Sequence, residues 1–169
     1  RGGVVNINVF NIRDFANDRH RTVDDRPYGG GAGMIMRVEP IVKALKQLNN
    51  NKAYKVLLSP RGNKLNQESA INLLKHNHLV FICGHYEGVD QRSLAYVDEA
   101  ISIGPFVLTG GEIPAMIITD ATVRLIKGVL KTDATENESF SKGLEEKLEQ
   151  PIPGNNAGFI YRPEGVYKT

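Results

Sequence analysis

The sequence lacks several features by which the class of a protein is most readily recognised. Its 169 residues contain a single cysteine, Cys83, which excludes a disulfide framework and a zinc site built from cysteines. No apolar run reaches the roughly 18 residues that a membrane span needs, and no secretory signal is visible. Charge of one sign is not in large excess, because 21 basic residues face 19 acidic ones and leave a net charge of +2. We therefore expect a cytoplasmic protein that uses no membrane, with a mildly basic balance compatible with an RNA partner.

Two common nucleotide-binding motifs are missing as well. There is no G-x-x-x-x-G-K-[ST] segment, so a P-loop is excluded. The glycine-rich segment YGGGAGM, residues 28–34, has Met34 where the third glycine of G-x-G-x-x-G belongs, which argues against a Rossmann dinucleotide site. His85 lies in a candidate loop, but one histidine alone does not make a metal site, and we assign no residues as metal ligands.

What is present is an alternation of predicted strands and helices. Strands are expected at residues 4–10, 54–58, 79–83 and 99–104. Helices are expected at residues 39–49, 66–76, 91–97 and 112–130. The strand pattern of residues 4–10 is an alternation with period two, whereas apolar residues of the helices recur every three or four positions. Because strands and helices alternate, we expect an α/β fold with a largely parallel sheet.

Glycine-containing loops follow three of the predicted strands. They are SPRG (59–62), GHYEG (84–88) and IGPFVLTGG (103–111). Ligands of parallel α/β folds bind beyond the C-terminal ends of the strands, and glycine costs stability unless bare backbone is needed. We therefore expect these loops to line a small-molecule pocket, although each glycine taken alone is also explained by a tight turn.

Three segments in a fixed order carry a resemblance to one family. They are VDDRPYGGGAGM (23–34), CGHYEGVDQR (83–92) and SIGPFVLTGGEIPAM (102–116). Together they closely resemble the bacterial tRNA (guanine-N1)-methyltransferases of the SPOUT class, over residues 1 to about 144. The resemblance implies a parallel-sheet SPOUT fold with a deep C-terminal trefoil knot, an exception to the rule of unknotted chains. It implies a methyltransferase domain at residues 1–140 whose first strand is missing. A charged short helix and irregular tail at 141–169 would follow, without the family's C-terminal tRNA-binding domain.

The resemblance also implies a cofactor, S-adenosylmethionine, held in a bent shape by the loops of the knot. The residues matched to cofactor contacts are Leu58, Ser59, Gly84, Tyr86, Glu87, Ser102, Ile103, Gly104, Leu108, Gly110, Gly111 and Pro114. Glu87 is matched in addition with a role in holding the substrate or a magnesium ion, which leaves Mg2+ open as a second requirement.

By the same resemblance the substrate is tRNA and the target is the guanine immediately 3′ of the anticodon (position 37). The residues matched to substrate contacts are Asp25, Tyr28, Gly30, Arg13 and Arg26; for the arginines, a solvated face is the alternative.

The chemistry requires a base and a cation. N1 of guanine carries a proton that a carboxylate must accept, and charge that develops on O6 is stabilised by a cation. The matched residues are Glu138, which stands where the family has aspartate, and Arg124. A solvated loop acid is the alternative for Glu138, and an ion pair with Asp120 is the alternative for Arg124.

Departures from the family pattern leave two functions open. Phe106 stands where tyrosine is usual, and Pro105 where an acid is usual. The first function is methylation of tRNA by a homodimer whose active site lies between two protomers. The second is a truncated knotted domain that binds S-adenosylmethionine and dimerises without methylating. Glu138 together with the missing ends favours the second. A third possibility is a related SPOUT enzyme that acts on another RNA, and the guanine-loop motif argues against it.

Overall fold

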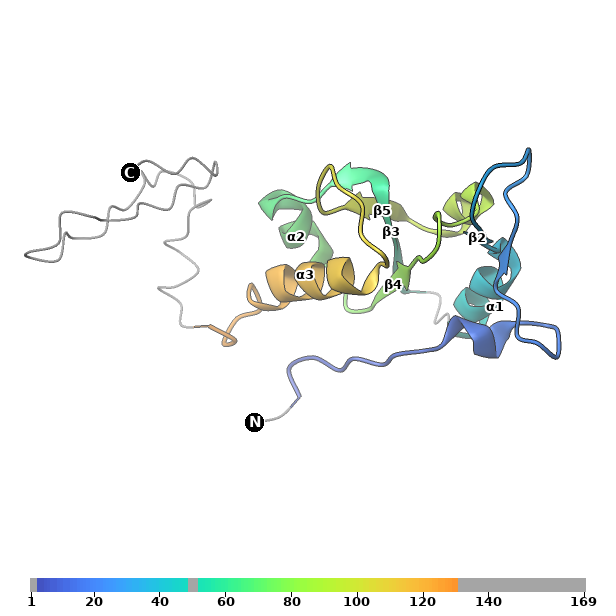
Figure 1. Ribbon diagram of the computed structural model, residues 1–169. Helices are drawn as coiled ribbons and strands as arrows, with labels where there is room; N and C mark the ends of the chain where they lie inside the picture. The colour runs from blue at the N-terminus through green and yellow to red at the C-terminus, as the bar shows by residue number, and fades with distance from the viewer. Residues whose placement is uncertain (1–2, 49–51, 131–169) are drawn as a thin grey trace, which may run out of the picture. The chain divides into compact units, whose positions relative to one another are not determined.

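A computed structural model describes residues 3–48 and 52–130 of the chain (Figure 1). In order, the elements are η1 (Ile12–Phe15), β1 (Asp24–Asp25), β2 (Ile35–Met36), α1 (Val38–Leu48), β3 (Tyr54–Lys64), α2 (Gln67–Leu73), β4 (Leu79–Cys83), η2 (Gln91–Tyr96), β5 (Glu99–Ser102) and α3 (Glu112–Val123). The described residues up to Ile126 form one compact unit. The alternation of strands and helices expected from residue 39 to residue 123 is confirmed, with η2 as a 3-10 helix.

The main sheet has three parallel strands in the order β4-β3-β5. The central strand β3 pairs with β4 from Tyr54↔Leu79 to Leu58↔Cys83. It pairs with β5 on its other side, where Leu58 lies opposite Ile101. The prediction of an α/β fold with a parallel sheet is therefore confirmed, whereas the trefoil knot stays a prediction.

Helices cover both faces of this sheet, with α1 on one side and α2 and α3 on the other (Figure 1). Because side chains of a strand alternate between faces, Leu57 packs with Ile41 of α1 while Leu58 packs with Ile118 of α3. Both clusters consist of aliphatic side chains whose removal from water favours folding. The ladder between β3 and β4 ends at Leu58. The loops after β4 and β5 begin near this C-terminal edge of the sheet.

Strand β3 runs further than predicted. The segment 59–62 was expected to be a loop, but β3 continues to Lys64, which lies opposite Ser102 after a register shift between Leu58 and Asn63. A Cβ atom at Gly62 would lie 2.5 Å from the carbonyl carbon of Ala100, so glycine permits this close approach. The extension carries mostly exposed polar residues, which is why no apolar pattern predicted it.

The strand predicted at residues 4–10 is wrong for this structure. The segment is exposed, with Ile7 at 68% and Val9 at 91% relative exposure, and it belongs to no strand. An apolar alternation is a preference that becomes a strand only when a neighbouring strand supplies hydrogen bonds. Among the described residues, none pairs with this segment.

Helix α3 is shorter than predicted. It ends at Val123, not at residue 130, and Gly128 beyond it has a positive φ of 89°. Its buried residues are Ile118 and Thr122, whereas Met116 is exposed. Apolar residues surround much of this helix, so sequence spacing alone did not determine which face packs.

Candidate functional site

The C-terminal ends of the parallel strands meet the start of α3 at one place. The ladder between β3 and β4 ends at Leu58 and Cys83, and Gly84 follows directly. The amide of Gly111 donates a hydrogen bond to the carbonyl oxygen of Gly84 at 2.9 Å. The loop before α3 is therefore fastened to the loop after β4, although the two are far apart in sequence.

The glycine at position 111 is required by this approach. A Cβ atom there would lie 2.6 Å from Cα of Cys83 and 3.0 Å from the amide nitrogen of Gly84. Both are backbone atoms, which cannot move aside as a flexible side chain can. Gly111 is buried and precedes the first residue of α3, so the glycine permits strand and helix to come into direct backbone contact.

The loop after β5 is stabilised by the last residue of that strand, Ser102. The hydroxyl of Ser102 donates to the carbonyl oxygen of Gly104 at 3.0 Å and accepts from the amide of Gly104 at 3.2 Å. Ser102 is buried, while Leu108 further along the loop is 37% exposed. A Cβ atom at Gly104 would overlap the ring of Phe106, which folds back over the turn. The start of this loop is therefore held in place by hydrogen bonds, whereas the apolar side chain of Leu108 remains accessible.

The loop after β4 is held on its other side by residues 33–36. The amide of Glu87 donates to the carbonyl oxygen of Met34 at 3.0 Å, and the amide of Met36 donates to the carbonyl oxygen of Gly88 at 2.9 Å. Gly33 has a positive φ of 84°, and a Cβ there would overlap the side chain of Glu87. Backbone hydrogen bonds thus hold the glycine-rich segment directly against the loop after β4.

Tyr86 adopts a backbone conformation that is rare for its residue type. Its φ is +62°, in the left-handed region that glycine usually occupies. Such conformations cost free energy and gather at functional sites, where the surroundings enforce them. Tyr86 lies in the loop of the candidate site, so this observation is consistent with its predicted role.

Sequence reasoning did not identify the interaction between His85 and Glu112. Nε2 of His85 lies 2.7 Å from Oε1 of Glu112, and residues 85 and 110 form an isolated antiparallel bridge. The pairing spans 27 residues, so no local spacing could reveal it. Burial, followed by the negative charge of Glu112, raises the pKa of the neighbouring Cys83 thiol to about 11.

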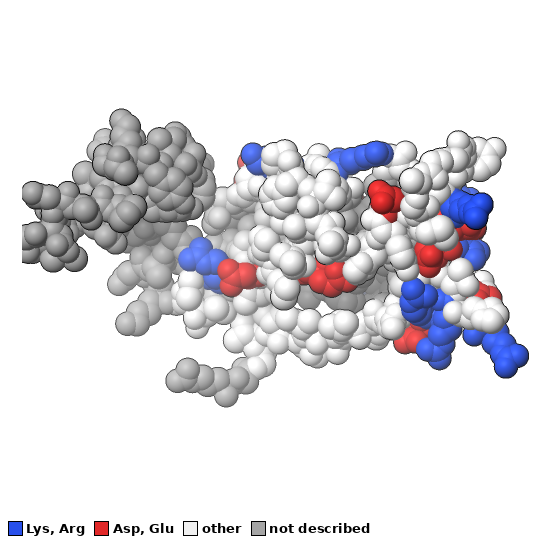
Figure 2. Space-filling model, viewed as in Figure 1, with Lys and Arg blue, Asp and Glu red and all other residues white. Residues whose placement is uncertain are grey.

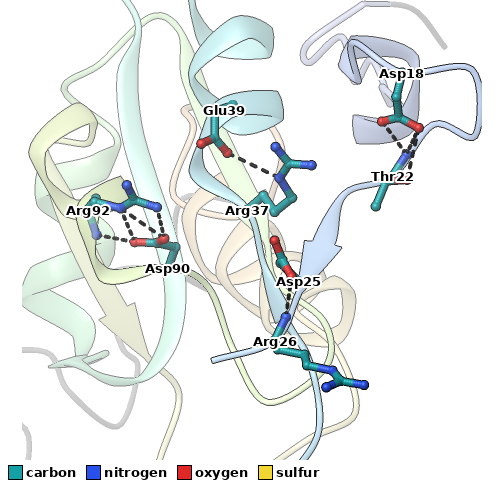
Figure 3. Close-up of polar contacts among 8 residues, drawn as sticks. All are labelled: Asp18, Thr22, Asp25, Arg26, Arg37, Glu39, Asp90 and Arg92. Atoms are coloured by element: carbon teal, nitrogen blue, oxygen red, sulfur yellow. Dashed lines mark hydrogen bonds and ion pairs between the residues drawn. The ribbon is translucent and has the colours of Figure 1, made fainter. Parts of the chain in front are cut away.

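Four of the five residues predicted to contact substrate lie in β1 or the loop that follows it, whereas Arg13 lies in η1. Strands β1 and β2 pair antiparallel and hold between them the loop that carries Arg26, Tyr28 and Gly30. Tyr28 is fully exposed, and Gly30 has a positive φ of 87°. Oδ1 of Asp25 accepts the amide N–H of Arg26 at 2.7 Å (Figure 3). Figure 2 shows Lys and Arg side chains, mixed with acidic ones, over the end of the molecule that carries η1 and α1.

The carboxylates of Asp90 and Asp18 stabilise the local structure of the segments around them. Asp90 accepts three hydrogen bonds from the guanidinium of Arg92, the shortest at 2.6 Å (Figure 3). The hydrogen bonds from Arg92 hold the pKa of Asp90 below its usual value. Asp18 receives hydrogen bonds from both the amide and the hydroxyl of Thr22. These carboxylates are occupied in fixing η2 and the loop before β1.

One of the two predicted catalytic residues, Arg124, lies at the C-terminal end of α3, the opposite end from Gly111. Arg124 follows α3 and lines an open groove of about 530 Å³ with Gln67, Ile113, Met116, Ile117, Asp120 and Ala121. At a rise of about 1.5 Å per residue, Arg124 lies roughly 18 Å along the helix axis from Glu112. Glu138 and the segment 141–169 lie outside the described residues.

The described loops fit the predicted cofactor by their chemistry. The twelve residues matched to cofactor contacts lie where the ladder between β3 and β4 ends, in the loop after β4, from the last residue of β5 to Gly111, or in the first turn of α3. Backbone groups of a glycine-rich loop can bind a nucleoside closely because no Cβ obstructs them. The described residues contain no group of three histidine, cysteine, aspartate or glutamate side chains that could hold a metal ion. In the same part of the chain, no helix combines the length and apolarity of a membrane span.

Comparisons with known proteins agree with the resemblance drawn from the three motifs. The family model for "tRNA (Guanine-1)-methyltransferase TrmD" matches residues 1–158. A tRNA (guanine-N(1)-)-methyltransferase of Carboxydothermus hydrogenoformans is 52% identical over 158 residues, which cover 92% of this chain and 62% of the relative. An enzyme of the same name from Dictyoglomus turgidum is 55% identical over 157 residues, 92% of this chain and 64% of the relative. The chain therefore spans less than two thirds of the length of these relatives.

Proposed function

This chain belongs to the tRNA (guanine-1)-methyltransferase TrmD family, and we propose that it methylates N1 of a guanine in tRNA with S-adenosylmethionine as the methyl donor. The target we propose is the guanine immediately 3′ of the anticodon (position 37), in the cytoplasm. Residues 1–140 would form the methyltransferase domain, with the predicted trefoil knot around the cofactor loops.

The convergence of the cofactor loops is the observation that carries this proposal. Gly84 and Gly111 are joined by a hydrogen bond of 2.9 Å, and Leu58 and Cys83 end adjacent strands beside them. In α/β proteins, ligands usually bind at the C-terminal edge of the parallel sheet. When bound there, the cofactor supplies an electrophilic methyl group on a sulfonium. The chain's own residues must then orient this group and exclude water from it.

The glycine-rich segment is suited to hold the guanine. The carboxylate of Asp25 is exposed and is oriented by the amide of Arg26. Guanine offers N1–H and N2–H donors on its Watson–Crick edge, which a carboxylate can accept after the base leaves its stack. Exposed Tyr28 and the positive φ of Gly30 are consistent with a loop that folds over the base. Glu87, next to Gly33, would support this loop or hold Mg2+.

We propose that the reaction needs two copies of the chain. Arg124 lies roughly 18 Å along α3 from Glu112, so we assign it to the cofactor loops of a partner subunit. The face of α3 that lines the groove carries exposed Ile113, Met116 and Ile117, which a second copy would cover. In such a homodimer, Arg124 of one protomer would stabilise charge on O6 beside the partner's cofactor loops, and Glu138 would accept the N1 proton.

Transfer of a labelled methyl group tests the proposal directly. S-adenosylmethionine would be offered with two tRNA transcripts that differ only in having guanine or adenine 3′ of the anticodon. Label in the guanine transcript alone supports the reaction and the position together. Label in neither, with cofactor bound in calorimetry, would favour the alternative of a binding domain that does not methylate.

A further inference from the structure

We propose that the pair formed by His85 and Glu112 is a clasp that holds the two glycine-bearing cofactor loops against each other. These two side chains would be positioning residues of the cofactor pocket, which rests on the function proposed above. Nε2 of His85 lies 2.7 Å from Oε1 of Glu112, within hydrogen-bonding distance.

The side-chain pair lies beside two backbone contacts that join the same loops. Residues 85 and 110 form an isolated antiparallel bridge, and Gly111 donates to the carbonyl oxygen of Gly84 at 2.9 Å. An isolated bridge has no neighbouring ladder to stabilise it, unlike a residue pair within a sheet. A side-chain contact between its two arms therefore has a direct effect on how often the loops separate.

Gly110 lies beneath the pair. A Cβ atom at Gly110 would lie 2.8 Å from Cε1 of His85 and would overlap the carboxylate of Glu112. The imidazole and the carboxylate thus rest against the bare backbone of a residue matched to cofactor contacts. Any larger residue at this position would push the two side chains apart.

Both ends of the clasp are anchored. The backbone amide of His85 donates to the sulfur of buried Met36 at 3.1 Å. Glu112 is the first residue of α3, where the helix dipole favours a carboxylate. The side chains themselves are about half exposed, so they add little to the core. The clasp therefore aligns two anchored loops without being needed for folding.

The titratable groups around the pair are few among the described residues. The thiol of Cys83 is close enough to sense the charge of Glu112, and the ring of Tyr86 stands edge-on to His85 at 6.4 Å. A neutral imidazole can still donate one N–H to the carboxylate. Loss of the imidazole or the carboxylate should therefore matter more than loss of the positive charge.

The test compares His85→Leu, Glu112→Ala and the double variant with His85→Gln, whose amide retains a donor near the position of Nε2. Glu68→Ala is the matched control, because it removes an exposed acid from the first turn of α2. Calorimetry would give the Kd of S-adenosylmethionine, and NMR would give the exchange rate of the Gly111 amide in the ligand-free protein.

We expect His85→Leu and Glu112→Ala each to raise the Kd and the Gly111 exchange rate about threefold to fivefold, as for a partly exposed pair. The double variant should be no worse than either single variant, because one contact is lost in all three. His85→Gln and Glu68→Ala should stay near wild type, and kcat at saturating cofactor should not change.

The outcomes separate this inference from the proposed function. Unchanged Gly111 exchange in His85→Leu and Glu112→Ala, or additive effects in the double variant, would overturn the clasp. A wild-type protein that bound no S-adenosylmethionine would instead overturn the proposed function. Faster Gly111 exchange in the variants would still support the clasp, since that readout needs no ligand.

Discussion

Arg13 donates a hydrogen bond from Nη2 to the hydroxyl of Tyr86 at 2.9 Å, across 73 residues of sequence. The same guanidinium donates from Nη1 to the carbonyl oxygen of Arg21 at 3.1 Å. One side chain therefore joins the loop before β1 to the loop after β4, where Tyr86 has a positive φ. In the proposed enzyme, these are a substrate-side loop and a cofactor-side loop. Arg13 would then act by aligning them as well as by its charge.

The first prediction concerns this link. We expect Arg13→Met and Tyr86→Phe each to lower kcat/KM for tRNA by about fivefold, the order of a partly exposed charge-assisted contact. The double variant should lose no more than the larger single loss, because both changes break the same hydrogen bond. Steady-state kinetics of methyl transfer measure this, with Arg19→Met as the control for loss of a basic charge. A loss in Arg13→Met without one in Tyr86→Phe would assign Arg13 to direct RNA contact.

The second prediction separates two glycines of the proposed cofactor loops. Gly111→Ala should lower the free energy of unfolding by roughly 1–3 kcal/mol, because the new methyl meets the backbone of Cys83. Gly104→Ala should cost less, because its methyl meets the ring of Phe106, which is half exposed and can turn away. Urea denaturation midpoints of the two variants and wild type measure the difference. Equal midpoints would mean that strand and helix can separate at Gly111 without cost.

Much of the fold followed from apolar patterns, and the exceptions have physical causes. Strand β4 was predicted with its observed bounds, because LVFIC is a continuous apolar run that ends at a glycine. Helix α1 was predicted within one residue, because Ile41 and Leu45 recur at helical spacing and are both buried. The far end of β3 was missed, since its residues are polar and its pairing with β5 involves a register shift.

The candidate site was predictable in its loops but not in its contacts. The three motifs located Gly84 and Gly111, yet nothing in the sequence indicated that their backbones bond to each other. The pair of His85 and Glu112 was missed for the same reason, because it depends on folding two distant segments together. Arg124 lies at the end of α3, whose helical character was predicted. Its proposed role depends on a second copy of the chain, which patterns within one chain do not report.

A third prediction follows from the ion pair at the start of η2. Hydrogen bonds from Arg92 lower the pKa of Asp90 in the folded protein, so the folded state favours the ionised carboxylate. This contribution is present above the unfolded-state pKa of about 3.9 and is lost as pH falls through the lower folded-state value. We expect Asp90→Asn to cost roughly 0.5 kcal/mol near neutral pH, because Arg92 is largely exposed, and progressively less below about pH 4. Chemical denaturation of both proteins at several pH values measures this. A constant difference across the series would contradict it.

The fourth prediction uses the single cysteine as a reporter of the pocket. Burial, and then the charge of Glu112, raises the pKa of Cys83 to about 11, so alkylation by iodoacetamide should be slow near about pH 8 and rise through the folded-state value. Glu112→Gln should lower this pKa, because it removes the negative charge. Saturating S-adenosylmethionine should slow alkylation, since Gly84 follows Cys83 directly. Mass spectrometry of the labelled protein measures each rate, and equal rates with and without cofactor would place the ligand elsewhere.

The last prediction tests whether one active site needs two chains. Leu108→Arg places a cation in the cofactor loop, where it should repel a sulfonium, and Leu108 is exposed enough for the fold to tolerate the change. Arg124→Ala removes the proposed cation at the far end of α3. Each variant alone should be nearly inactive. When the two variants are unfolded and refolded together in equal amounts, half of the dimers should contain one chain of each variant. Each mixed dimer should carry one intact site out of two, which restores about a quarter of wild-type activity. Each variant refolded by itself is the control. No restoration, with mixed dimers confirmed by native mass spectrometry, would mean that Arg124 and Leu108 serve the same subunit's site.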